Sequence, residues 1–391
     1  MSHRPTDAEI RALFTAQNKE HAEVTAFLAG YNLNGYPSGL VHVMEHSELN
    51  RLAAKAGMKD PDYVNNHKEV YAAAMKAFDT MCCDQWIPDN PLTMGQAGYE
   101  HGSFSAPTGA KVVLDGMAIE DPDDVAEHLE TIVFPRLKDR IANYDKEARV
   151  REIGLSEYDQ QMEMGLDKLK TGYGYIQFPI MDYYAYGYEN YFCAYAMYPE
   201  LIDEHFRLQA ELCYKNNDAA AEAINRYDLP RGFRLDHDMT DGRGTLVSLK
   251  SLEQMWFPRF EYCLRPILEQ TNCRMMWHCD GDIRPMVPGL IECGVVGFQG
   301  FQYEYGVDFA ELCKLRGRDG SPLSMSAGVS VTRTLPYGTP AEVRRDLDYL
   351  VEVHRDTALG LGASSSVLPG VPSANIDAMV EGLLYYQTHL K

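Results

Sequence analysis

A short apolar run ends in a group of polar side chains in the stretch Met275-Met276-Trp277-His278-Cys279-Asp280-Gly281-Asp282. The apolar residues are typical of a buried β-strand, and a histidine, a thiol and two carboxylates follow at its carboxyl end. In parallel α/β proteins, functional side chains gather at the carboxyl ends of the strands. The alternative interpretation is a strand end with a hydrogen-bonded histidine and an Asp-Gly turn, because such turns are common.

The same pattern recurs in other segments of the second half of the chain. Phe233-Arg234-Leu235-Asp236-His237-Asp238 ends in charged residues, and the predicted strand 295–304 ends on Glu304. Helical segments separate these runs, with short loops and no return hairpins, which indicates parallel strands joined by right-handed crossovers. The sequence therefore predicts an α/β fold with roughly eight strands, a (β/α)8 TIM barrel. A doubly wound sheet is the alternative, but no glycine-rich phosphate loop follows a strand.

The first 80 residues predict a helical extension that precedes the barrel. Apolar spacing predicts one helix over residues 5–30 and a second helical region over residues 47–80, interrupted at Asp60-Pro61. Without flexible linkers or repeats, we expect a single domain. It consists of the extension, residues 1–80, and the barrel, residues 81–391.

Residues 172–184 predict a strand that leads into a segment rich in aromatic side chains. Seven tyrosines lie within the sixteen residues 183–198. Packing between helices is one interpretation, because aromatic stripes usually pack. A pocket wall that stacks a flat or apolar substrate is the other. We therefore consider Tyr184, Tyr186 and the more distant Tyr303 as candidate substrate-binding residues.

The composition excludes several classes of partner. The 391 residues carry a net charge of −21, from 36 basic and 57 acidic side chains, and so acidic a surface repels nucleic acid and anionic membranes. The charge also disfavours a heavily carboxylated substrate unless local arginines offset it. Arg333 is one candidate partner for a substrate carboxylate, with plain surface charge as the alternative. Nine scattered cysteines, no signal peptide and no long apolar run predict a soluble, cytoplasmic protein.

Several segments after residue 232 carry a resemblance to a known family. They are Asp236-His237-Asp238-Met239, Trp277-His278-Cys279-Asp280-Gly281-Asp282, residues 298–304, Leu335-Pro336-Tyr337-Gly338-Thr339-Pro340-Ala341-Glu342-Val343 and Leu368-Pro369-Gly370-Val371-Pro372-Ser373-Ala374-Asn375. With them the chain resembles the uroporphyrinogen decarboxylase superfamily over residues 80–391, and within it the cobalamin-dependent methyltransferases. The resemblance implies a (β/α)8 barrel, which agrees with the strand count.

The resemblance also implies a metal site. Members that methylate thiols hold zinc with a His-x-Cys pair, a later cysteine and a nearby glutamate. Here the pair reads His278-x-Asp280, the later cysteine falls within the serines 364–366, and the glutamate position is Glu304. A zinc ion at these residues would have only nitrogen and oxygen ligands. A metal-free hydrogen-bonded acid–base cluster is the alternative. Strand alternation turns Cys279 away from the face of His278.

The arginine-rich segment of true uroporphyrinogen decarboxylases is missing, so the chain resembles the O-demethylase members better. These move a methyl group from a methoxylated donor, aromatic donors included, to the cobalt of a separate corrinoid protein. Asp203-Glu204-His205 begins like a cobalt-ligand motif but lacks its glycine. We therefore expect a corrinoid protein and a small-molecule methyl donor as partners, and a homodimer as a candidate assembly.

This function assigns roles to the polar strand ends. His278 and Asp280 would protonate the leaving oxygen, or share a metal that polarises it. Asp236 and Asp238 would orient the acid or bind substrate hydroxyls, and His237 is the alternative proton donor. Two other functions stay open, a lyase that acts on a small carboxylic acid and a non-catalytic binding barrel. The number of titratable groups weighs against the binding barrel.

Overall fold

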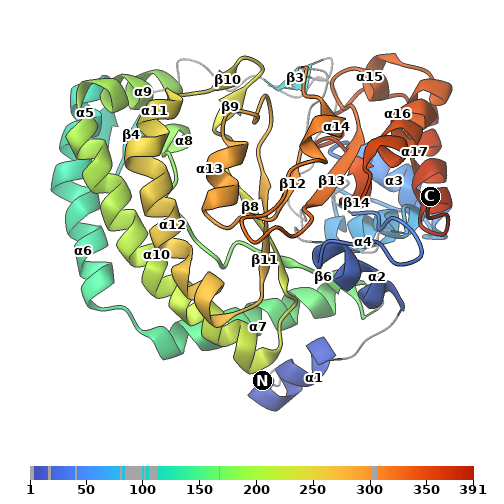
Figure 1. Cartoon of the computed structure of the whole chain (residues 1–391), viewed down its shortest axis with the longest axis horizontal. Coiled ribbons are helices and arrows are strands. Elements are labelled where there is room, and N and C mark those ends of the chain that lie inside the picture. Colours follow the sequence, from blue (N-terminus) through green and yellow to red (C-terminus); the bar gives the residue numbers. More distant parts are fainter. Residues whose placement is uncertain are drawn as a thin grey trace.

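The computed structural model describes residues 4–15, 19–39, 42–79, 82–83, 99–100, 103–104, 112–166, 168–300 and 306–391. Its centre is a six-stranded sheet in the order β14-β13-β12-β11-β8-β7, in which all neighbouring strands are parallel (Figure 1). The strands are β7 (Gly172–Tyr173), β8 (Gly232–Asp236), β11 (Arg274–His278), β12 (Gly297–Gln299), β13 (Ser324–Val329) and β14 (Ala358–Ala363). The α/β class and the parallel strands agree with the sequence prediction.

Short parallel pairings extend this sheet at both edges. β1 (Cys82–Cys83) pairs with β6 (Leu169–Lys170), which directly precedes β7. At the other edge, two isolated parallel bridges join residues 38–43 to residues 361–367. The arrangement is compatible with a TIM-barrel-like fold, but no pairing between β1 and residues 38–43 closes the barrel within the described residues.

Helices cover the outside of the sheet, and α10 and α12 lie side by side along it (Figure 1). The helices after residue 112 are α5 (Pro122–His128), α6 (Phe134–Ala142), α7 (Lys146–Met164), α8 (Tyr183–Tyr186), α9 (Tyr188–Met197), α10 (Pro199–Tyr227), α11 (Leu249–Ser251), α12 (Phe257–Gln270), α13 (Val287–Glu292), α14 (Phe309–Leu312), α15 (Thr334–Tyr337), α16 (Pro340–Val353) and α17 (Ser373–Tyr386). π-Helical turns η1 (Leu129–Val133) and η2 (Leu252–Trp256) lead into α6 and α12. Asp121 and Thr339 begin α5 and α16 with capping boxes, each followed by a proline that suits the first helical turn.

The N-terminal region packs directly on the sheet. It contains α1 (Asp7–Thr15), α2 (Lys19–Leu28), α3 (His46–Lys55) and α4 (His67–Ala77). Helices α1 and α2 fall within the range 5–30 that the sequence predicts as helical, and residues 16–18 between them lie outside the described part. The side chain of Leu28 fills the space over Gly232, and the carbonyl of Phe27 accepts a hydrogen bond of 2.8 Å from the hydroxyl of Ser324. Because Gly232 and Ser324 begin their strands, α2 covers the amino end of the sheet.

Residues 172–184 do not form the long strand that their apolar pattern predicts. The strand ends at Tyr173, and side chains of α10 bind the backbone of the next residues in place of a neighbouring strand. Asn217 accepts a hydrogen bond of 2.8 Å from the amide of Gln177, and Gln209 accepts one of 2.8 Å from the amide of Ile180. The backbone groups are therefore satisfied outside the sheet, and the chain turns into α8.

The expectation that the second half has no return hairpins is also wrong. β9 (Thr240–Asp241) and β10 (Gly244–Thr245) form an antiparallel hairpin directly after β8. Further antiparallel pairs are β2 (Tyr99–Glu100) with β3 (Ser103–Phe104) and β4 (Val112–Leu114) with β5 (Met117–Ile119). The β9–β10 hairpin and α15, which follow the carboxyl ends of β8 and β13, lie together at the top of Figure 1. Loops that follow the carboxyl ends of β8 and β13 therefore lie at this end of the molecule.

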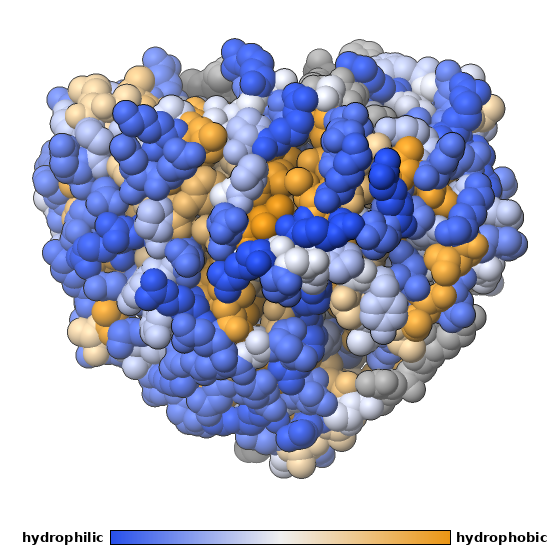
Figure 2. All heavy atoms as spheres, viewed as in Figure 1, coloured by the Kyte–Doolittle hydropathy of each residue, from blue (hydrophilic) through white to orange (hydrophobic). Residues whose placement is uncertain are grey.

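The molecular surface in the same view is hydrophilic around its rim, and apolar side chains gather in the middle of the face (Figure 2). None of the helices in the described part of the chain is long and apolar enough to cross a membrane.

A buried ion pair fixes β6 to helix α7. The amino group of Lys170 lies 2.6 Å from both carboxylate oxygens of Glu157, and their side chains are only 1% and 2% exposed. Removing one partner of such a pair leaves an uncompensated charge in the core. The pair therefore holds the β6–β7 edge in place beside the site.

We predict that Lys170→Met lowers the free energy of unfolding by about 3–5 kcal/mol, because Glu157 remains as an unpaired buried charge. Chemical denaturation followed by circular dichroism measures this change. The exposed pair of Lys68 and Glu163, 2.8 Å apart, is the control. Lys68→Met should cost less than about 1 kcal/mol, and equal losses in the two variants would contradict the anchoring role of Lys170.

Candidate functional site

The register of three parallel strands brings polar side chains to one level. His278 on β11 is paired with Asp236 on β8 on one side and with Gln299 on β12 on the other. Residues that pair in a parallel sheet point to the same face, so these three side chains lie side by side at the carboxyl ends of their strands. The structure therefore brings together His278 and Asp236, which the sequence placed on separate strand ends.

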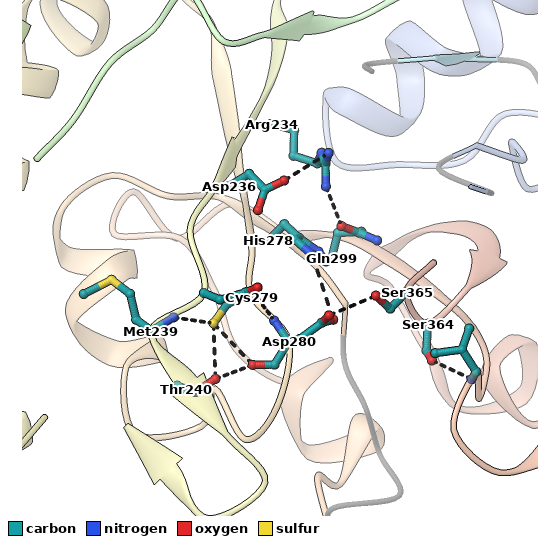
Figure 3. A network of polar contacts seen from close by, with 12 residues as sticks. Arg234, Asp236, Met239, Thr240, His278, Cys279, Asp280, Gln299, Ser364 and Ser365 are labelled. Atoms are coloured by element: carbon teal, nitrogen blue, oxygen red, sulfur yellow. Dashed lines mark hydrogen bonds and ion pairs between the residues drawn. The ribbon is translucent and has the colours of Figure 1, made fainter. Parts of the chain in front are cut away.

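Asp236, Asp238 and His278 form a compact group. Each offers one ligand atom, and these atoms lie within 4.8 Å of one another. The guanidinium of Arg234 lies 3.2 Å from Asp236 and also donates a hydrogen bond of 3.3 Å to Gln299 (Figure 3). The same Oδ2 of Asp236 also accepts a hydrogen bond of 3.2 Å from the hydroxyl of Tyr173, so Arg234 and Tyr173 both bind this oxygen.

Asp280 stands next to this group with one free carboxylate oxygen. Its Oδ1 lies 3.9 Å from Nε2 of His278, and its Oδ2 accepts a hydrogen bond of 3.0 Å from Ser365 (Figure 3). Its backbone amide donates a hydrogen bond of 3.0 Å to Asp238. Burial, reinforced by the charges of Asp238 and Asp236, raises the pKa of Asp280 to about 6, although His278 and Ser365 lower it and the side chain remains 39% exposed. A carboxyl with such a pKa can exchange a proton near neutral pH.

Cys279 faces away from the group, as strand alternation predicts. Its sulfur lies 3.2 Å from both the amide of Met239 and the hydroxyl of Thr240, and burial raises the pKa of the thiol to about 12. The thiol is therefore protonated and unreactive at neutral pH.

The turn after Asp280 requires a glycine. Gly281 has a φ of +88°, and a Cβ there would lie 2.5 Å from the carbonyl oxygen of Asp241. Only glycine allows this turn to pack against the β9–β10 hairpin.

The ring of His237 supports the backbone that leads into α8. Its Nε2 accepts a hydrogen bond of 2.9 Å from the amide of Met181, and its ring stacks on that of Tyr183 at 5.7 Å. Burial lowers the pKa of His237 to about 4. The ring therefore holds the segment before α8, and the structure does not bring it into the group of Asp236, Asp238 and His278.

The remaining predicted residues fall in different places. The hydroxyl of Tyr184, a residue that is 65% exposed, donates a long hydrogen bond of 3.4 Å to Asp238, so this side chain borders the group. Tyr186 is buried, and its hydroxyl lies 2.8 Å from Nδ1 of His128, away from the group. Arg333 is exposed at the start of α15. Tyr303 and Glu304 lie outside the described residues.

The structure adds to the site two residues, His42 and Arg234, that the sequence analysis did not select. His42 lies on the N-terminal segment that bridges to residues near β14, where its carbonyl accepts a hydrogen bond of 2.7 Å from Val367. Burial and the nearby Arg234 and His278 lower the pKa of His42 to about 3. Arg234 itself was detectable in the sequence, because it lies two residues before Asp236 on the same strand and so on the same face.

The donor atoms fit a metal ion that prefers nitrogen and oxygen. His278 Nδ1 and Asp280 Oδ1 are buried and have no hydrogen-bond partner among the described residues. Among the described residues, the close group consists of Asp236, Asp238 and His278. Of the predicted set His278, Asp280 and Glu304, the group contains His278, and Glu304 lies outside the described residues. It has an imidazole and two carboxylates and no thiolate, a set that zinc and other divalent ions accept.

The backbone also leaves room for the imidazole of His278. Gly300, which follows β12, has a φ of +95°, and a Cβ there would lie 2.7 Å from Nδ1 of His278. Any side chain at residue 300 would therefore push the ring from its position, so the glycine shapes the site.

A comparison with solved structures finds a similar fold. The structure is similar to that of a methyltransferase from Methanosarcina mazei, with a TM-score of 0.56 and 15% sequence identity over 95% of this chain and 99% of the other. No protein-family model matches the sequence, and no curated protein matches it significantly. At this identity the similarity concerns the fold alone.

We predict that Asp280→Asn stabilises the metal-stripped protein, increasingly so as the pH rises. The folded-state pKa of about 6 lies above the usual value of 3.8, so folding favours the protonated carboxyl and the stability that Asp280 contributes is lost as the pH rises through about 6. The gain should stay below roughly 1.4 kcal/mol per pKa unit because the carboxyl is partly exposed. Denaturation at pH values between about 4 and 8 measures it.

Asp282→Asn is the matched control with the opposite sign. The hydrogen bonds from Arg284 hold the pKa of Asp282 below its usual value, so this carboxylate stabilises the fold above about pH 4 and the contribution is lost at lower pH. Asp282→Asn should therefore destabilise the protein at neutral pH. The same sign for both variants would contradict the burial of Asp280.

Proposed function

We propose that this protein is a methyltransferase component that moves a methyl group from a methoxylated donor to the corrinoid of a separate protein. The observation that carries the proposal is the convergence of Asp236, Asp238 and His278 within 4.8 Å at the carboxyl ends of parallel strands. The similarity of the fold to that of a methyltransferase supports it, and so does the resemblance of the strand-end motifs to the cobalamin-dependent methyltransferases.

The chemistry requires help for the leaving oxygen, because an ether oxygen leaves poorly without a proton or a Lewis acid. A divalent metal held by Asp236, Asp238 and His278 would supply Lewis-acid polarisation, and a corrinoid supplies the cobalt nucleophile that accepts the methyl group. Asp280, with its pKa of about 6, is the proton donor within reach of this position. As the carbon–oxygen bond breaks, the oxygen keeps the bonding electrons and takes the proton of Asp280.

The neighbouring residues position this acid. Ser365 fixes one oxygen of Asp280, and the backbone contact with Asp238 fixes the turn, so the free oxygen points towards His278. Arg234 neutralises part of the charge on Asp236 and thereby limits repulsion among three adjacent carboxylates.

We also infer that residues 38–43 close an eight-stranded barrel beside β1. The hydroxyl of Ser38 donates a hydrogen bond of 3.3 Å to the carbonyl of Asp79, shortly before β1.

One observation favours a lyase on a small carboxylic acid as the second candidate. Asp280 has the pKa of a proton donor, and the buried guanidinium of Arg234 lies close by, where it can attract a substrate carboxylate. Release of carbon dioxide by the purified protein alone, without a corrinoid protein, would select this function.

We predict that His278→Ala lowers the rate of methyl transfer from a methoxylated donor to a reduced corrinoid protein by at least about 100-fold, because the leaving oxygen loses its support. Loss of the cobalt(I) absorbance measures the rate, and elemental analysis of the same preparations measures bound metal. The metal content should fall together with the activity.

Cys279→Ser is the matched control, since it changes the adjacent side chain by one atom outside the group of ligands. This variant should keep both its metal and its rate. An unchanged rate in His278→Ala would refute the proposed role of the group.

A further inference from the structure

A cavity of about 500 Å³ lies beside β8, at the point where β7 ends. Its walls are formed by β8, by residues 173–182 after β7, and by helices α6 and α10. Arg234 and Asp236 line it from the central sheet, and Arg136 and Arg140 line it from α6. The cavity therefore lies between α6, at the outer edge of the ribbon in Figure 1, and the strand that carries Asp236. Its volume is that of a small-molecule site.

The cavity exists because the edge of β8 is only partly covered. β7 pairs with Phe233 and Arg234 and goes no further. Beyond that point, the side chains of Asn217 and Gln209 hold residues 174–182 towards α10. In residues 168–300, which are all described, no strand therefore covers Asp236 on this side. The open edge gives a ligand access to Asp236.

Apolar side chains form part of the walls, and two arginines line the cavity from α6. Leu137, Ile176, Phe178 and Leu212 are among the residues that line the cavity. Arg136 and Arg140 lie one turn apart on α6, and both are exposed.

The two arginines differ in how their charge is used. Arg136 forms an ion pair of 2.8 Å with Asp115. Arg140 has no carboxylate partner among the described residues, so its charge is available to a ligand. Although the whole chain is acidic, this local pair of arginines can hold an anion.

Besides Asp236, a second acidic side chain, Asp182, lines the cavity. Asp182 lies 3.6 Å from Nε2 of His205, and that nitrogen is also 3.0 Å from the side-chain amide of Gln209. Burial raises the pKa of Asp182 to about 6. A carboxyl that protonates this readily repels a bound anion less than an ordinary aspartate does.

We propose that this cavity binds the methyl donor as a small monoanionic acid with an apolar, ring-sized body, and that Arg140 selects the donor by pairing with its carboxylate. The assignment rests on the proposed function, because it places the far end of the ligand at Asp236. Apolar side chains in the walls hold the body, while Arg140 on α6 and Asp236 on β8 line the cavity from different elements. Arg140 is then a specificity-determining residue at some distance from the polar group.

Ligand titration tests the assignment without any corrinoid protein. The probes are 4-methoxybenzoate and methoxybenzene, which share a ring and differ by one carboxylate. Wild-type protein should bind the acid more tightly, and Arg140→Gln should weaken its binding by about tenfold or more while leaving methoxybenzene unchanged. Arg136→Gln should have a smaller effect because Asp115 already pairs with that side chain. Ile176→Trp, which fills the cavity, should abolish binding of both probes.

The outcomes separate this assignment from the proposed function. Binding of the acid that depends on Arg140, without methyl transfer, would support the pocket and overturn the proposed function. Methyl transfer from 4-methoxybenzoate that is equally fast in Arg140→Gln would overturn the pocket assignment. Equal affinity for the two probes, or binding that persists in a correctly folded Ile176→Trp protein, would overturn it as well.

Discussion

The parallel register of β8, β11 and β12 is the constraint on which the site depends. It pairs His278 with Asp236 and Gln299, and a slip of one residue would turn His278 to the helix-facing side. Trp277 prevents this slip, because it is fully buried on the opposite face. Its ring lies 5.2 Å from that of Phe178 and 5.4 Å from that of Phe260. A large aromatic side chain in the helix layer thus fixes the direction of the imidazole beside it.

The parts of the fold that the sequence predicted are those in which the periodicity is local. The strand that ends at His278 and the long helix α10 are clear from apolar patterns, and both are present. The strand predicted over residues 172–184 failed for a tertiary reason. Its backbone bonds to Asn217 and Gln209, which lie on a helix that comes later in the chain. No local pattern contains that information.

The residues of the site also divide into those that the sequence could predict and those that it could not. Asp236, Asp238 and His278 could be found because Asp236 and His278 end strands and Asp238 follows two residues after Asp236, and strand ends converge in parallel sheets. The contact of His237 with the amide of Met181 and the approach of His42 could not be found, because each depends on how a distant irregular segment folds back. Irregular segments carry no periodic signal, so their contributions to a site become visible only in three dimensions.

The pairing of residues 38–43 with the region of β14 has a consequence for biosynthesis. Asn32 accepts a hydrogen bond from the amide of Leu359, 327 residues further along the sequence, so all the residues up to 359 must leave the ribosome before the N-terminal segment finds its partner. Helix α2, which covers the amino end of the sheet, must also wait for β13 and β14. Contacts between such distant residues form slowly and leave apolar surfaces exposed in the meantime. Helix α2 is therefore made long before the strands that cover it, and its apolar face must be kept from aggregation until β13 and β14 have been synthesised.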